Sequence, residues 1–357
     1  MEIIEYFFDL SPKNNYFKKR KLLLPENDSF LLFGSRGTGK TALLLSYLNA
    51  LEISTWLYID CQDPIFALED IDTAMLNNFI KNKNIQTVAL DHYYDGFLEE
   101  LPISKQLIVV SREQALIDMD NKLGLYPLDY EEFLSFDKSH TSNFNHFFKA
   151  GTLPMTAMLN LHSLPQRFRD FFYSSFDEDE SRLMLILAKH QGQRVTTHQI
   201  YTYAKEYFRI SKDWVYKTIK KFAREELIIF IDDSLNKGAR KMFLYDFALS
   251  KYLSKSQAFP VTFDAMVVLA LYKHHIRFEA LGIHGYLIHK HELIVPSAFE
   301  NEDIFWKKSY EKTALYKKYN ITKVTVVSVS SGYTFKIGNI NFEALPFYEW
   351  SIINEEY

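Results

Sequence analysis

The sequence predicts an α/β protein whose first part is a parallel sheet with helices on both faces. Apolar runs recur at residues 30–33, 55–59, 87–90 and 106–110, and segments long enough for helices or loops separate them. Such continuous runs, alternating with helical segments, are typical of strands buried on both faces. Further along, three helical segments followed by a two-strand ribbon predict a winged helix, and a smaller α/β domain is expected to close the chain.

The segment after the first run fills every position of the phosphate-binding loop pattern G-x-x-x-x-G-K-[ST]. It consists of Gly34, Ser35, Arg36, Gly37, Thr38, Gly39, Lys40 and Thr41. Its glycines let successive N–H groups face phosphate oxygens, and the helix expected over residues 42–50 adds a favourable dipole. We expect Lys40 to reach the β- and γ-phosphates and Thr41 to bind Mg²⁺. The pattern and its context predict a nucleoside triphosphate site.

Asp91 directly follows the third apolar run. Ligands of open α/β sheets collect at the carboxyl ends of the strands, so Asp91 is expected to hold the Mg²⁺ that bridges the phosphates. Lys40 and Asp91 are therefore the predicted catalytic residues. Ser111 ends the fourth run, where it is either a sensor of the γ-phosphate or an ordinary strand-ending serine.

The predicted winged helix has helices over 181–189, 196–207 and 212–226, then a ribbon over 227–245. Its third helix and ribbon carry many basic residues: Lys212, Lys217, Lys220, Lys221, Arg224, Lys237, Arg240 and Lys241. This pattern fits two interpretations. The lysines bind a DNA duplex through its phosphates, or they form a solvated face of a module that contacts proteins.

The last part is expected to contain helices over 261–273 and 303–318, and several short strands. The strands are placed at 276–279, 286–289, 293–295, 323–330 and 333–337, before an apolar tail at 345–353. His284, His289 and His291 lie close in sequence, but an alternating strand would place His284 on the opposite face from the other two. The pattern favours ordinary histidines over a metal site.

Composition limits the remaining classes. The chain has 357 residues, 47% of them hydrophobic, and a net charge of −4. This length predicts two or three domains. Its one cysteine, Cys61, excludes an internal disulfide framework and a cysteine-rich zinc site. We see no signal-peptide pattern at the start and no apolar run of membrane-spanning length, so we expect a cytoplasmic protein without membrane contact.

Residues 34–41, Asp91 and the segment LYPLDYEEFL at 125–134 together resemble prokaryotic AAA-type ATPases of the archaeal-ATPase group. The resemblance implies ATP and Mg²⁺ as cofactors. Adenine is also the expected base because residues 121–124, Asn-Lys-Leu-Gly, lack the final Asp of the Asn-Lys-x-Asp pattern that reads guanine. The resemblance also implies four domains. These are a P-loop ATPase core over 1–130, a helical lid over 131–175, a winged helix over 176–250 and a restriction-nuclease-like α/β domain over 251–357.

Two departures from the family pattern bear on activity. In the family, the Walker B Asp, which corresponds to Asp91 here, is followed by a Glu that polarises the attacking water. In this chain His92 follows Asp91. Asp95, Glu99, Glu100 or His92 itself could take that role. In the last domain the Asp and Glu-x-Lys of a nuclease are missing from residues 283–297, so we expect this domain to lack catalysis.

Two functions follow from the sequence. The first is a Mg-dependent ATPase that couples nucleotide state to domain rearrangement. The alternative is a non-hydrolysing ATP-binding switch, or a DNA- or protein-binding module, with negligible turnover. A homo-oligomer or a protein partner fits either. In an oligomer, Arg112, Arg167 or Arg169 could reach the γ-phosphate of a neighbour.

Overall fold

The computed structural model describes residues 2–10, 12, 18–136, 143–255 and 257–353. These residues form two compact units. The N-terminal unit extends to Tyr126 and also includes Arg224–Glu226, and the C-terminal unit contains the other residues from Pro127 onward. Residues 137–142 of the expected lid lie outside the described residues.

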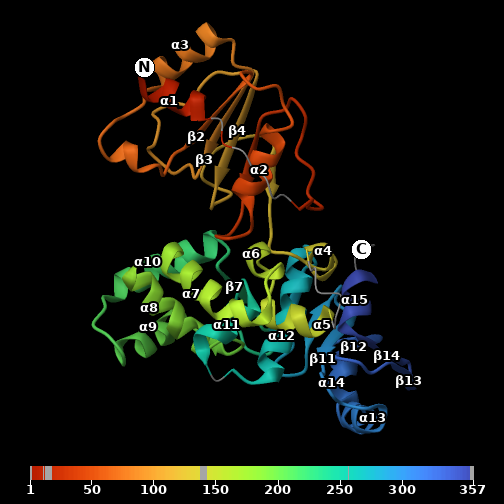
Figure 1. Ribbon diagram of the computed structural model, residues 1–357. Coiled ribbons are helices and arrows are strands. Elements are labelled where there is room, and N and C mark those ends of the chain that lie inside the picture. The colour runs from red at the N-terminus through yellow and green to blue at the C-terminus, as the bar shows by residue number, and fades with distance from the viewer. Residues whose placement is uncertain (1, 11, 13–17, 137–142, 256, 354–357) are drawn as a thin grey trace. The chain divides into compact units, whose positions relative to one another are not determined.

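The N-terminal unit is built on a five-stranded parallel sheet (Figure 1). Its strands are β1 (Phe30–Phe33), β2 (Trp56–Asp60), β3 (Thr87–Asp91), β4 (Gln106–Ser111) and β5 (Lys122–Gly124). They lie in the order β2-β3-β4-β1-β5. The predicted parallel sheet is confirmed. The sequence did not predict β5, because three half-buried residues carry no recognisable apolar run.

Helices cover both faces of this sheet, as the apolar runs require. Leu43, Leu44 and Leu48 of α2 (Lys40–Leu48) pack on one face with Phe30 and Leu32. The opposite face packs against α1 (Glu2–Leu10) and α3 (Thr73–Lys83), and a 3₁₀ turn, η1 (Pro64–Ala67), follows β2. Alternate residues of each strand thus enter different cores, which explains why the strands are continuously hydrophobic.

The C-terminal unit begins with helices α4 (Tyr130–Phe136), α5 (Asn143–Ala150), α6 (Pro154–Ala157) and α7 (Leu164–Ser175), with a 3₁₀ turn, η2 (Leu161–Ser163). Asp246 ties this segment to helix α11 (Phe247–Ser254). Its buried carboxylate accepts a hydrogen bond from the Thr152 hydroxyl at 2.6 Å and caps α11 through the Leu249 N–H, also at 2.6 Å. Because the Asp246 carboxylate both caps α11 and binds Thr152, it fixes the backbone at the start of α11 relative to the loop at Thr152.

The winged helix is confirmed. It contains α8 (Glu178–Lys189), α9 (Thr197–Lys205), α10 (Lys212–Arg224) and the antiparallel strands β6 (Arg194–Val195), β7 (Ile228–Ile231) and β8 (Arg240–Leu244), in the order β6-β8-β7. Helix α10 ends two residues earlier than predicted. Glu226 has φ of 54°, and a left-handed residue ends a right-handed helix.

Among the described residues from 247 to 353, the structure has a mixed six-stranded sheet and five helices. The order β13-β14-β12-β11-β10-β9 joins β9 (Phe278–Ala280), β10 (Tyr286–Ile288), β11 (Glu292–Pro296), β12 (Lys323–Ser328), β13 (Tyr333–Ile337) and β14 (Ile340–Pro346). The helices are α11, α12 (Phe259–Lys273), α13 (Glu302–Glu311), α14 (Thr313–Lys318) and α15 (Phe347–Ile353). This confirms the predicted small α/β domain.

The structure corrects two local expectations in this region and specifies a third. The helix predicted over 303–318 is two helices, because Lys312 leaves the helical conformation at φ −90°, ψ 4°. The apolar tail at 345–353 contains the end of β14 and the helix α15. His289 and Lys290 both have positive φ in the turn after β10, so the assumed alternation from His284 to His291 does not hold.

Candidate nucleotide-binding site

The glycine loop leaves the carboxyl end of β1 and enters α2, as the pattern predicts. Gly34, Gly37 and Gly39 have φ of 150°, 81° and 93°, a region that side chains rarely adopt. A Cβ atom at Gly34 would lie 2.3 Å from the Leu125 carbonyl oxygen. Only glycine fits there, because the loop and the segment after β5 run in direct contact.

Hydrogen bonds hold the loop in its wrapped shape. The Thr38 hydroxyl donates to the Ser35 carbonyl at 3.0 Å. The buried guanidinium of Arg20 donates to the carbonyls of Thr38 and Tyr126, both at 2.7 Å. Sequence reasoning missed Arg20, since no local pattern distinguishes it from the lysines around it.

Lys40 lies inside the curve of the loop. Its ammonium donates to the carbonyl oxygens of Gly34 at 2.7 Å and Ser35 at 2.9 Å. Burial lowers the pKa of Lys40 to about 8, and the nearby Asp91 carboxylate opposes that shift. A desolvated ammonium held by two neutral carbonyls is ready to exchange them for charged phosphate oxygens, which form stronger hydrogen bonds.

Asp91 is fully buried at the end of β3, and β4 lies between β3 and the loop strand β1. One carboxylate oxygen accepts the His92 N–H at 2.8 Å, and the other accepts the Tyr58 hydroxyl at 3.0 Å. Burial and the Asp91 carboxylate raise the pKa of Tyr58, so its hydroxyl stays a donor. The carboxylate is thereby held in one orientation.

The His92 ring lies between Thr41 and Asp60, a residue that sequence analysis did not single out. Its Nδ1 lies 2.8 Å from Oδ1 of Asp60, and its Nε2 lies 3.5 Å from the Thr41 hydroxyl. Asp60 ends β2 in register with Asp91 on β3. The hydrogen bond to Asp60 raises the pKa of His92, against the effect of burial. Burial opposes ionisation of Asp60, but hydrogen bonds from His92 and the Gln62 N–H lower its pKa.

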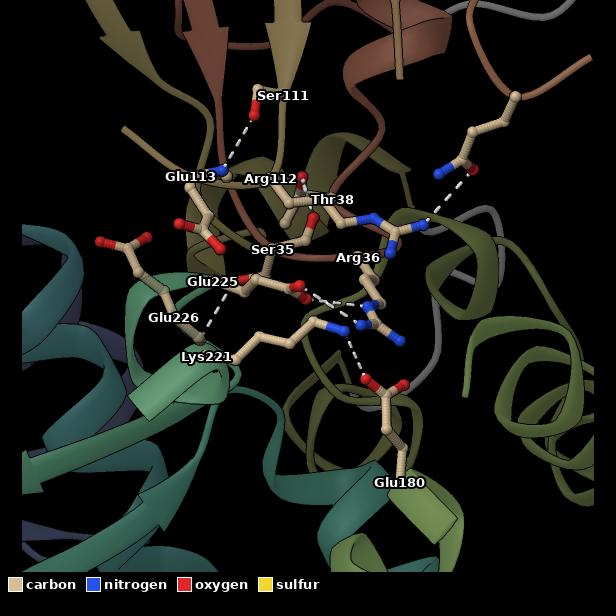
Figure 2. Close-up of polar contacts among 12 residues, drawn as sticks. Ser35, Arg36, Thr38, Ser111, Arg112, Glu113, Glu180, Lys221, Glu225 and Glu226 are labelled. Atoms are coloured by element: carbon tan, nitrogen blue, oxygen red, sulfur yellow. Dashed lines mark hydrogen bonds and ion pairs between the residues drawn. The ribbon is translucent and has the colours of Figure 1, made fainter. Parts of the chain in front are cut away.

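A second unforeseen feature is a buried ion pair on the loop. Nε of Arg36 lies 2.9 Å from a Glu225 carboxylate oxygen, and both side chains are nearly inaccessible, at 5% and 3% exposure. Beside it, the Ser35 hydroxyl donates to the Glu226 carbonyl at 3.0 Å (Figure 2). Residues 224–226 therefore pack on the phosphate loop. Sequence analysis did not single out Glu225, because no local pattern distinguishes it from other acidic residues.

The structure places the other predicted residues less centrally. Ser111 is buried, and its hydroxyl accepts the Glu113 N–H at 3.2 Å. Nη2 of Arg112 lies 3.5 Å from the Gln62 amide oxygen. Arg167 and Arg169 are exposed on α7. The three carboxylates considered as substitutes for the missing Glu are exposed in the segment between β3 and β4: Asp95, Glu99 and Glu100.

The basic residues of the winged helix divide into two groups. Lys212, Lys217 and Lys220 are exposed on α10, and Lys237 and Arg240 are exposed in the ribbon. Three others pair with acids: Lys221 with Glu180 at 2.6 Å, Arg224 with Glu113 at 3.0 Å, and Lys241 with Asp264 at 2.6 Å. Lys241 is mostly buried and also donates to the Tyr286 hydroxyl, so the expectation that it belongs to a DNA-binding or solvated face was wrong.

The oxygen donors near the loop suit Mg²⁺. The ion prefers one or two protein oxygens together with phosphate oxygens and water, and Thr41 and Asp91 offer a hydroxyl and an oriented carboxylate. No group of three or more His, Cys, Asp or Glu residues among the described positions is arranged to hold a metal ion.

These features define the class of the protein: an α/β fold with a P-loop-type parallel sheet, followed by a winged helix and a small α/β domain. The chain is similar to the Aeropyrum pernix ORC1 protein, solved in complex with DNA, at 12% identity and a TM-score of 0.32. The match covers 65% of this chain and 87% of that one. No protein-family model and no curated protein sequence matches the chain. None of the helices in the described ranges is both long and apolar enough to cross a membrane.

Proposed function

We propose that this protein binds Mg-ATP at residues 34–41. The observation that carries the proposal is the loop itself: it leaves no room for a side chain at Gly34 and holds the Lys40 ammonium within its curve. Lys40 would contact the β- and γ-phosphates, and Thr41 and Asp91 would hold the metal. Mg²⁺, when bound, neutralises charge on the phosphates.

We assign to residues 224–226 the coupling of nucleotide binding to the rest of the chain. These residues contact the loop through Arg36 and Ser35, and they continue directly into α10 on one side and β7 on the other. A change in the loop on nucleotide binding would alter those contacts. Because linkage is reciprocal, a partner that moves α10 would change nucleotide affinity by the same factor.

Two outputs are compatible with this binding site. The first is an ATPase of the AAA type, in which hydrolysis drives the rearrangement. The second is a switch that binds ATP with negligible turnover, and His92 in the place of the family's Glu favours it. DNA binding through α10 is a further candidate, supported by the exposure of Lys212, Lys217 and Lys220.

The test is a calorimetric titration of the full chain with Mg-ATP. Lys40→Ala should weaken binding at least about 10-fold, since a buried charge-assisted contact is worth more than about 1.4 kcal/mol. Lys105→Ala is the matched control, because Lys105 is exposed and immediately precedes β4. It therefore lies at the amino ends of the parallel strands, whereas the loop lies at their carboxyl ends. Equal affinities for wild type and Lys40→Ala would refute the proposal.

Coupling needs its own measurement. Hydrogen exchange of residues 218–231, with and without Mg-ATP, should change in the wild type and stay constant in Lys40→Ala. If exchange in the wild type is identical with and without Mg-ATP, the site binds nucleotide but does not transmit binding to α10 and β7.

A further inference from the structure

A connected aromatic surface lies beside the helices that cover one face of the N-terminal sheet. Tyr6 meets Phe7 with 5.3 Å between ring centroids, and Phe7 stacks on Phe66 at 5.4 Å. Phe66 meets Phe97 at 5.0 Å, and Phe97 meets Tyr94 at 5.5 Å. The rings come from α1, η1 and the segment after β3, so three separate parts of the chain build one surface.

Much of this surface is open to solvent. Tyr6 and Tyr94 are each 46% exposed, and Phe66 and Phe97 are half-buried. Leu68, two residues after Phe66, is 92% exposed. We call these five residues the aromatic patch. An exposed apolar patch with a polar border is typical of a surface that binds another molecule.

Hydrogen bonds hold the segment after β3 against α3. The Thr73 hydroxyl donates to the Glu100 carbonyl at 2.7 Å, and the Asn77 side-chain oxygen accepts the Ile103 N–H at 2.8 Å. The patch is therefore already formed in the chain alone. A preformed surface loses little conformational entropy when a partner binds.

The border of the patch carries one sign of charge. Residues 2–10, 61–80 and 93–104 build this region and contain no Lys or Arg, although the whole chain has 41 Lys and Arg against 45 Asp and Glu. The acidic residues of these segments are Glu2, Glu5, Asp9, Asp63, Glu69, Asp70, Asp72, Asp95, Glu99 and Glu100. All of them except the half-buried Asp63 are exposed. The patch therefore lies in a negative electrostatic field.

The lysines that follow these segments lie toward the other end of the strands. Lys81 and Lys83 are in the last turn of α3, before β3, and Lys105 immediately precedes β4. Phe66 and Tyr94 instead follow the carboxyl ends of β2 and β3. The acids around the patch thus keep their negative charge without compensation from these lysines.

We propose that the aromatic patch binds a basic segment of a partner protein, one in which apolar side chains lie between Lys and Arg residues. The patch offers Tyr side chains, which are frequent anchors of protein interfaces. Its acidic border attracts Lys and Arg, and it repels the phosphates of nucleic acids and of anionic lipids. The inference goes beyond the nucleotide site and does not depend on it.

The first test measures binding of a peptide probe to the full chain by fluorescence anisotropy. The probe is a fluorescein-labelled peptide of Leu and Lys whose leucines recur at helical spacing, and its matched control has Glu in place of every Lys. The Lys peptide should bind at least about 10-fold more tightly, and added salt should weaken its binding because salt screens the acids. Equal affinities for the two peptides would overturn the proposal.

A second test locates the binding. The double variant Leu68→Ser/Tyr94→Ser should weaken binding of the Lys peptide at least about 10-fold, because it removes two apolar contacts from the interface. Leu23→Ser is the control. Leu23 is 73% exposed, and its neighbours Leu22 and Leu24 pack in the core on the opposite face of the sheet. The urea midpoint of each variant checks that it remains folded.

A third test concerns the acidic border. Replacing Glu69, Asp70 and Glu99 by the corresponding amides should reduce the salt dependence of Lys-peptide binding, because fewer charges remain to be screened. An unchanged salt dependence would show that these acids do not select the partner, which contradicts the proposal.

Other results would assign the patch to a different occupant and overturn the proposal. If the wild type sediments as a dimer and Leu68→Ser/Tyr94→Ser as a monomer, a second copy of the chain covers the patch. If the wild type binds phosphatidylcholine vesicles and this variant does not, the patch contacts a membrane. Equal binding of the Lys peptide by the wild type and this variant also excludes the patch as the docking surface.

Discussion

Removing the carboxylate of Glu225 should destabilise the N-terminal unit strongly. Arg36 is 5% exposed and Glu225 is 3% exposed, so Glu225→Ala leaves a guanidinium that water reaches poorly. Breaking a buried ion pair by removing one partner costs about 3–5 kcal/mol. That is a large share of the roughly 5–15 kcal/mol that stabilises a typical domain.

A surface pair of the same segment supplies the control. Arg224 and Glu113 lie 3.0 Å apart, but their side chains are 60% and 22% exposed. Exposed pairs contribute only about 0–1 kcal/mol, because water and salt screen them. Glu113→Ala should therefore lower the free energy of unfolding by less than about 1 kcal/mol.

The assay uses the chain's one cysteine. Cys61 is 1% exposed in the N-terminal unit, so the urea dependence of its labelling reports the unfolding of that unit. If Glu225→Ala and Glu113→Ala shift the midpoint equally, burial of the Arg36 pair does not carry the energy assigned to it. The double replacement of Arg36 and Glu225 by Met should recover most of the loss, because it removes the buried guanidinium together with the carboxylate.

Three further predictions follow from the same coordinates. Thiol labelling of native Cys61 at pH 8 should be much slower than in urea, since burial, followed by the nearby Asp91 carboxylate, raises the pKa of the thiol; labelling at equal rates would contradict this. Gly34→Ala should abolish Mg-ATP binding and destabilise the N-terminal unit, because its Cβ would meet the Leu125 carbonyl at 2.3 Å. Gly96→Ala is the control: its Cβ would have no atom within 4 Å, so it should cost only about 1 kcal/mol of backbone strain. Similar losses of stability in both variants would contradict this interpretation of the loop. If α10 binds duplex DNA, replacing Lys217 and Lys220 by Gln should reduce the slope of log affinity against log salt by about 2, and an unchanged slope would exclude these two lysines from the contact.

The paired and exposed lysines of α10 show why charge patterns alone misassign residues. Lys217 and Lys221 lie on the same helix, but Lys221 is bound to Glu180, which is 6% exposed, and Lys217 is exposed. A charge that compensates a buried acid is costly to divert to a phosphate. The sequence does not show which acids are buried, so it cannot separate the two roles.

The sequence alone determined the features that depend on neighbouring residues. The glycine pattern at 34–41, the apolar runs of β1 to β4, and the three helices and ribbon of the winged helix are local signals, because backbone freedom and periodicity act over a few positions. They were sufficient to predict the fold class and the place of the loop.

Tertiary structure decided which distant side chains complete the site. Glu225 lies 189 positions after Arg36, and Asp60 lies 32 positions before His92. No local sequence pattern identifies either carboxylate, because an exposed acidic residue and a buried, paired one have the same sequence signature. Sheet register brings Asp60 beside His92, and burial makes the Glu225 carboxylate the counter-ion of Arg36. Short-range patterns predict elements, but long-range packing sets the charge and orientation of the groups between them.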